Sequence, residues 1–251
     1  MKSNNIHSIY PISWICESPI FRDYVSSKIN SSDEFLVADF ASGEHDRVPS
    51  FFINNLSEFV SITKTQSERI HVYCLDIHAL RLDSLLGKLE ESDLLQKARV
   101  VKAKLESMDK HASFRPAMAE FLKDNPNYSI WLDDFLIAEQ KLPSGCFDIG
   151  ILNNDIIGYM MEYYTEYSNA IRGLKKVQSS IKNDGLLIVT NPCSLYVIDN
   201  VELLQKIGFN FSEGIDIDTN SGLLTSIEAD QDPKTMSRLG HYTFLIFKVA
   251  K

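Results

Sequence analysis

The sequence predicts an α/β fold in which helices flank a mostly parallel sheet and the C-terminal strand runs antiparallel to its neighbours. Three observations support this prediction. Short apolar runs alternate with segments of helical apolar spacing along most of the 251 residues. Two of these runs end in an aspartate that a helical segment follows, which is typical of parallel strands. The last two predicted strands, at residues 210–217 and 242–249, have a loop and no helix between them, which favours an antiparallel edge.

The composition is that of a globular protein with a sizeable core. Hydrophobic residues make up 44% of the chain and charged residues 24%, so one large domain is expected at residues 35–251 after a lead-in at residues 1–34. The net charge of −9 argues against DNA as a partner, because binding along phosphates needs a basic surface. No apolar run is long enough for a transmembrane helix and no signal peptide is visible, so we expect a cytoplasmic protein without a membrane partner.

Cysteine and histidine usage gives no indication of a metal site. The four cysteines are scattered without a C-x-x-C pair, which suits reduced thiols better than a disulfide framework or a zinc site. The six histidines show no metal-ligand spacing with cysteines or acids, so no metal is expected. Among the histidines, His7 and His45 are the first candidates for mutation.

The lead-in is expected to contain a helix that begins after Ser18. Serine is a good N-cap and proline is favoured at the first helical position, as in Ser18-Pro19. Apolar residues at positions 20, 21, 24, 25 and 29 then recur roughly on one helical face. Such a helix either packs against the main domain or forms a lid over a pocket.

The first predicted strand, at residues 35–39, ends in Asp39 and leads into a loop of small residues. Ala41, Ser42 and Gly43 let the backbone approach a ligand closely, and a helix is expected at residues 49–59. Parallel-sheet proteins build a nucleotide pocket in this way, at the carboxyl end of the first strand.

The second predicted strand, at residues 70–76, ends in Asp76. In doubly wound nucleotide-binding folds, an acid at this place binds the ribose hydroxyls, because a carboxylate can accept hydrogen bonds from both. Residues 79–127 are helical in pattern and much longer than a crossover requires, so a helical insertion is expected there. Three interpretations of this insertion are open: a solvent-exposed helical addition to the fold, a dimer interface, or a cap that is specific to the substrate.

The remaining strands follow the same alternation. Strands are expected at residues 128–132, 147–152 and 186–190, with a long helix at residues 156–180, a turn at residues 183–185 and a short helix at residues 200–207. Asp133, Asp134 and Phe135 follow the first of these strands, and Asn153, Asn154 and Asp155 follow the second. Asp148, at the start of its strand, is interpreted as structural.

In this order the pattern resembles the class I S-adenosylmethionine (SAM)-dependent methyltransferases over residues 35–250. The resemblance rests on five elements, which are the loop from Asp39 to His45, Asp76, Asp134 with Phe135, residues 147–153 and residues 181–189. It implies a Rossmann-like, doubly wound, mostly parallel seven-stranded sheet with an antiparallel C-terminal strand. The family's acid-x-Gly-x-Gly-x-Gly loop has Ala41, Gly43 and His45 at its glycine positions here, so only the central glycine is kept.

The resemblance also implies site residues for SAM and its product S-adenosylhomocysteine (SAH). It assigns Asp39, Ala41, Ser42, Gly43 and Asn153 to the methionine end and Asp76 to the ribose. It assigns Ile77, Asp134 and Phe135 to the adenine. Such a pocket suits the cofactor, which has polar handles and a flat apolar ring.

The expected reaction is methyl transfer to a small-molecule acceptor. The candidates for catalytic residues are Asn153, Asn154, Asp155 and Tyr159, and a tyrosine-rich helix could line an acceptor pocket. Asp155 is either a base or the N-cap of that helix. The family signature by itself fixes no catalytic residue, because the enzyme mainly aligns the reactants and excludes water.

Other functions stay open at this stage. They are a methyltransferase for protein or RNA, and a non-catalytic SAM-binding or interaction module, which the altered glycine loop favours. A dinucleotide-dependent oxidoreductase is disfavoured because Gly-x-Gly-x-x-Gly is absent. Aminopropyl transfer ranks low because the glycine-rich loop of that family is missing.

Overall fold

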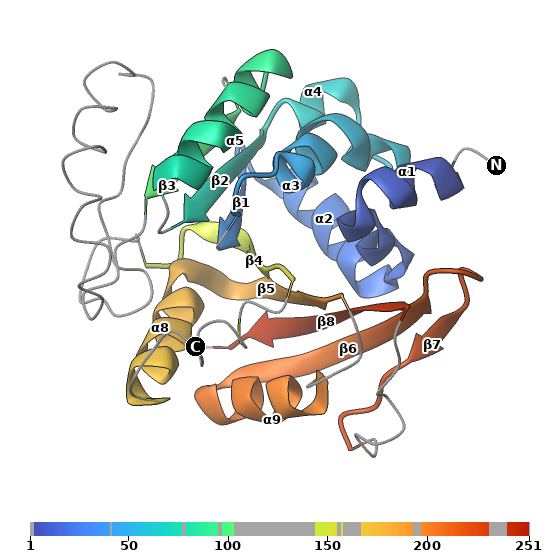
Figure 1. The fold of residues 1–251 in the computed structure, drawn as a ribbon, viewed down its shortest axis with the longest axis vertical. Coiled ribbons are helices and arrows are strands. Elements are labelled where there is room, and N and C mark those ends of the chain that lie inside the picture. Colours follow the sequence, from blue (N-terminus) through green and yellow to red (C-terminus); the bar gives the residue numbers. More distant parts are fainter. Residues whose placement is uncertain are drawn as a thin grey trace.

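A mixed sheet forms the centre of the computed structural model, which describes residues 3–40, 42–76, 79–94, 97–102, 144–154, 157, 167–192, 197–230 and 240–250. The strands are β1 (Phe35–Phe40), β2 (Ile70–Asp76), β3 (Ala98–Lys102), β4 (Phe147–Leu152), β5 (Ile181–Asn191), β6 (Phe209–Asp218), β7 (Leu224–Ser226) and β8 (His241–Val249). Their order within the described part of the sheet is β3-β2-β1-β4-β5-β8-β6-β7 (Figure 1).

The first five strands are parallel, and β8 is antiparallel to both β5 and β6. The predicted α/β class with an antiparallel C-terminal strand is therefore confirmed. The three-residue β7 adds a short edge strand beyond the seven that the prediction counted.

Helices cover both faces of this sheet. Those described are α1 (Ser3–Ile9), α2 (Pro19–Ser31), α3 (Arg47–Ser50), α4 (Lys64–Ser67), α5 (Ala79–Glu91), α8 (Tyr167–Ser180) and α9 (Val197–Ile207), with a 3₁₀ segment at Pro11–Glu17 and further π and 3₁₀ turns at Phe51–Asn55 and Leu56–Glu58. One apolar cluster packs α2, α3 and α5 on one face, and a second packs α8 and α9 on the other (Figure 1). No helix in the described ranges has the length and apolar character needed to cross a membrane.

The segment at β3 corrects the sequence prediction. Residues 98–102 belong to the part interpreted as a helical insertion, but they form a strand parallel to β2, with Val72 opposite Ala98. The apolar residues of this short run fit both periodicities, and the β-branched pair Val100-Val101 suits a strand. Helix α5 begins at Ala79, where the helical insertion was predicted to begin. The strand predicted at residues 128–132 lies outside the described residues.

The N-terminal segment is part of the main core. The Ser18 hydroxyl accepts a hydrogen bond from the backbone N–H of Phe21 at 3.1 Å, so the predicted N-cap is confirmed. The same hydroxyl also donates to Glu213 on β6. Val25 and Ile29 are fully buried in the cluster beneath α2. The lead-in therefore packs against the sheet, and its action as a lid stays a prediction.

His7 packs inside this N-terminal segment. Its ring stacks on Trp14 with 3.9 Å between centroids, and its Nδ1 lies 2.6 Å from the Ser13 hydroxyl oxygen. Burial lowers the pKa of His7, against a smaller opposing effect from Glu17.

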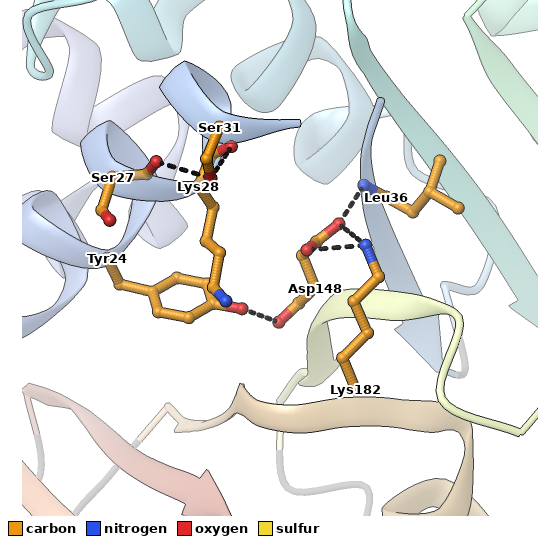
Figure 2. Close-up of polar contacts among 7 residues, drawn as sticks. All are labelled: Tyr24, Ser27, Lys28, Ser31, Leu36, Asp148 and Lys182. Atoms are coloured by element: carbon orange, nitrogen blue, oxygen red, sulfur yellow. Dashed lines mark hydrogen bonds and ion pairs between the residues drawn. The ribbon is translucent and has the colours of Figure 1, made fainter. Parts of the chain in front are cut away.

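Asp148 joins β4 to three other elements (Figure 2). Its buried carboxylate accepts hydrogen bonds from the backbone N–H of Leu36 at 2.9 Å and from Lys182 Nζ, which lies 2.8 Å from both carboxylate oxygens. Its backbone carbonyl accepts a hydrogen bond from the Tyr24 hydroxyl at 3.0 Å. The structural interpretation of Asp148 thus agrees with its contacts, which link β1, β5 and α2 at the amino end of the sheet.

We expect Asp148→Ala to lower the free energy of unfolding by about 3 kcal/mol, because it leaves the Leu36 N–H and the Lys182 ammonium without their shared partner. Urea unfolding measures this loss. The exposed pair Lys206–Glu202, 3.4 Å apart, provides the control. Lys206→Ala should change stability by less than about 0.5 kcal/mol. Equal effects of the two substitutions would contradict the anchoring role of Asp148.

Candidate functional site

The carboxyl ends of β1, β2 and β4 meet at one edge of the sheet. Asp39 on β1 is in register with Cys74 on β2 and with Ile151 on β4. Asp76 lies two residues beyond Cys74, at the end of β2. Because these three strands are parallel, their last residues and the loops that follow them gather at the edge where α/β proteins bind their ligands.

Asp39 is a buried carboxyl group with unused hydrogen-bonding capacity. Its side chain is 1% exposed, and its Oδ1 atom has no hydrogen-bond partner among the described residues. Burial raises the pKa of Asp39 to about 7, and the negative charge of Asp76 contributes to this rise. A buried acceptor without a partner is costly. Asp39 is therefore suited to receive a cationic or hydrogen-bond-donating ligand.

Asp76 holds the loop that follows β1. Its Oδ2 accepts a hydrogen bond from the Gly43 backbone N–H at 2.9 Å, and the Ser42 backbone N–H donates to the Leu75 carbonyl at 2.8 Å. The resemblance assigned Asp76 to the ribose and not to the loop. The two roles are compatible, because a carboxylate can accept several hydrogen bonds.

Gly43 gives this loop its open surface. Its φ angle is +65°, a value that L side chains rarely adopt. Apart from its chain neighbours, no described residue has a heavy atom within 4 Å of the place where a Cβ would be. His45 is exposed, and the short helix α3 has Asp46 as its N-cap residue, so His45 does not cap it. The loop therefore presents backbone to open space beside the two buried carboxyl groups.

Asn153 and Asn154 follow β4 and are held by Thr190 at the end of β5. The Thr190 hydroxyl donates to Asn153 Oδ1 at 2.6 Å and accepts from the Asn154 backbone N–H at 2.9 Å. Asn154 has a φ angle of +56°, so this turn lies in the left-handed region. Tyr242 on β8 is buried and lies two residues before Phe244, the register partner of Thr190.

The structure thus brings Asp39, Ser42, Gly43, Asp76 and Asn153 to one edge of the sheet, with the exposed Asn154 beside them. The other predicted site residues, which are Ala41, Ile77, Asp134, Phe135, Asp155 and Tyr159, lie outside the residues whose side chains are described.

Thr190 was not predicted as a site residue. It is the polar end of an apolar run, a signal that the sequence does contain.

Cys74, which lies next to Asp39 in the sheet, is a free thiol and is fully buried. Burial raises its pKa well above the ordinary value, and the negative charges of Asp39 and Asp46 add to this effect. The thiol therefore stays protonated at neutral pH, and neither nucleophilic nor metal-binding chemistry is expected of it. Within the described ranges, no group of three or more histidine, cysteine, aspartate or glutamate side chains could hold a metal ion.

Comparison with solved structures identifies the fold. The [4+2]-cyclase SpnF superposes with a TM-score of 0.50 at 11% identity, over 92% of this chain and 80% of SpnF. A SAM-dependent methyltransferase from Methanosarcina mazei also reaches 0.50, at 9% identity, over 93% of this chain and 98% of that one. The chain has the class I methyltransferase fold.

Sequence comparison adds nothing to this result, since no protein-family model and no curated protein matches the chain. At such low identities the likeness concerns the fold alone, and function has to be argued from the site.

The pKa of Asp39 predicts how stability depends on pH. The unfolded chain releases this proton near pH 4, whereas the folded chain keeps it until about pH 7. The folded state therefore binds more protons in this window, so the free energy of unfolding falls as the pH rises from about 4 to about 7. Asp39→Asn removes this loss and should gain stability relative to the wild type, by up to roughly 4 kcal/mol at pH 8 and much less at pH 5.

Urea unfolding of both proteins at the two pH values measures this difference. Asp83→Asn, at an exposed position on α5, is the matched control and should follow the wild type. Parallel pH profiles for Asp39→Asn and the wild type would show that Asp39 is ionised normally in the folded protein.

Proposed function

We propose that the protein is a SAM-dependent methyltransferase that acts on a small-molecule acceptor. The observation that supports this most directly is the buried oxygen of Asp39 beside Asp76 at the carboxyl ends of β1 and β2, which has no hydrogen-bond partner among the described residues. A buried carboxyl group with an elevated pKa is a common mark of a functional site. Ligands of α/β sheets bind at this edge, which supports the assignment of a SAM site to it.

The described residues fit such a cofactor. The open space beside Gly43 lets the loop backbone lie against a ligand, and the free oxygen of Asp39 is available for a donor or a cation. Asp76 is placed to accept from ribose hydroxyls while it also holds the loop. The bound cofactor would supply a methyl group already activated on a sulfonium. These residues would then orient the ligand and keep its charged end out of bulk water.

The choice of a small molecule as acceptor rests on charge and sequence. A net charge of −9 disfavours long contact with a phosphate backbone. The residues after β4, Asn153-Asn154-Asp155-Ile156, differ from the Asn/Asp-Pro-Pro-aromatic motif of enzymes that methylate amino groups in nucleic acids. Asp155 and Tyr159 remain candidates on the acceptor side. A homodimer and a cytoplasmic location belong to the same proposal.

A second candidate is a SAM-binding protein that does not transfer methyl groups. The loop after β1 keeps one of the three family glycines, at Gly43, and one protein of similar fold is a [4+2]-cyclase. Cofactor binding without methyl transfer to any acceptor, including protein and RNA, would favour this candidate over the first.

Ligand-dependent stability tests the cofactor assignment. SAM or SAH at about 100 times its dissociation constant should raise the free energy of unfolding by roughly 2.7 kcal/mol, and NAD should have no effect. Thermal unfolding with each ligand measures the shift. Asp76→Ala should abolish it, because this change removes both the acid at the ribose position and the hydrogen bond that holds Gly43.

Asp83→Ala is the control for the loss of a negative charge, since Asp83 is exposed on α5. It should keep the full ligand shift. No shift with SAM or SAH in the wild type would refute the cofactor assignment.

The ionisation of Asp39 predicts a pH-dependent affinity for SAM. If the cationic end of SAM binds the ionised carboxylate, the competent fraction rises from about one in eleven at pH 6 to about ten in eleven at pH 8, given a pKa of about 7. Calorimetry should therefore show roughly tenfold tighter SAM binding at pH 8 than at pH 6. In Asp39→Asn, the two affinities should agree within about twofold. A steep dependence that survives this substitution would assign the titration to another group.

A further inference from the structure

The Thr190 hydroxyl fixes the turn that follows β4. Thr190 is fully buried at the end of β5, the neighbouring parallel strand. It donates to the side-chain oxygen of Asn153 at 2.6 Å and accepts from the backbone N–H of Asn154 at 2.9 Å. One side chain therefore determines both the orientation of the Asn153 carboxamide and the backbone of the next residue.

The proton of the Thr190 hydroxyl sets the direction of its bond to Asn153. A hydroxyl group has one proton, and Thr190 donates it to Asn153 Oδ1. The oxygen of the same hydroxyl accepts the Asn154 N–H.

This direction leaves Asn153 as a hydrogen-bond donor. Its Oδ1 is occupied by Thr190, and its half-buried NH₂ group has no partner among the described residues. The loop after β1 has fewer donors to offer, because the N–H of Ser42 is bound to Leu75 and the N–H of Gly43 to Asp76. An anionic group that enters this edge of the sheet would find the Asn153 amide as a donor already oriented.

We propose that Thr190 is a positioning residue that holds the Asn153 carboxamide as a donor for the carboxylate of the cofactor's amino-acid end. This inference rests on the proposed function, because it presumes that SAM and SAH bind here. It adds the group that recognises the carboxylate and the residue, on β5, that orients this group.

The experiment compares SAH with 5′-methylthioadenosine, which has the same nucleoside but no amino acid. Calorimetry is done on the wild type, Thr190→Val, Thr190→Ser and Asn153→Ala. Thr190→Val and Asn153→Ala should weaken SAH binding about tenfold or more, as expected for a lost hydrogen bond to a charged group. Both should leave the affinity for 5′-methylthioadenosine within about twofold. Thr190→Ser keeps the hydroxyl and should bind SAH like the wild type.

A further variant guards against a loss of folding. Thr243→Val is the matched control for Thr190→Val, since Thr243 is fully buried on β8 and its hydroxyl oxygen has no partner among the described residues. It should leave both affinities unchanged.

The outcomes separate this inference from the proposed function. A wild type that binds neither compound would refute the cofactor assignment and this inference with it. A wild type that binds both, with a SAH preference that Thr190→Val leaves unchanged, would overturn this inference alone. An equal loss of both ligands in this variant would assign Thr190 to folding and would overturn it as well.

Discussion

The structure depends on the hydrogen bonds that Asp148 forms at the amino ends of β1, β4 and β5. Its carboxylate accepts from the backbone N–H of Leu36 on β1 and from the Lys182 ammonium on β5. Its backbone carbonyl accepts from the Tyr24 hydroxyl on α2. A shift of one residue between parallel neighbours would exchange the faces of every side chain. The contact with Leu36 therefore supports the register that sets Asp39 opposite Ile151 at the other end of the strands.

The buried aspartates at the two ends of the sheet, Asp148 and Asp39, differ in their hydrogen bonding. At the amino end, Asp148 is buried but accepts hydrogen bonds from Leu36 and Lys182. At the carboxyl end, Asp39 is equally buried, has an oxygen without a partner among the described residues and lies near the negative charge of Asp76. A folded protein retains such an arrangement at a cost in stability. The contrast within one sheet favours a structural role for the first aspartate and a ligand-binding role for the second.

The sequence predicted the features that depend on local pattern. The end of β2 at Asp76 and the N-cap at Ser18 follow from apolar runs and their polar boundaries, and the structure agrees. The end of β1, predicted at Asp39, lies one residue further on, at Phe40. The strand β3 was misinterpreted, because five residues are too few to distinguish a strand from a helical turn.

The link from Thr190 to Asn153 could not be predicted in the same way. These residues are 37 positions apart in the chain and meet through the pairing of β4 with β5. A hydrogen bond of this kind depends on strand order and register, which hydrophobic periodicity does not encode. The site residues at strand ends were therefore predictable, and the residues that orient them across the sheet were not.

The contact between Ser18 and Glu213 has a consequence for the order of folding. It joins positions 195 residues apart, and the helix that begins at Ser18 buries Phe21, Val25 and Ile29 in the core. A ribosome makes this helix 195 residues before Glu213 on β6, so the packing of α2 is complete only after that stretch of chain has been made. Contacts over such long separations slow folding and leave apolar surface exposed during synthesis. Helix α2 is thus made long before the strand that completes its final environment.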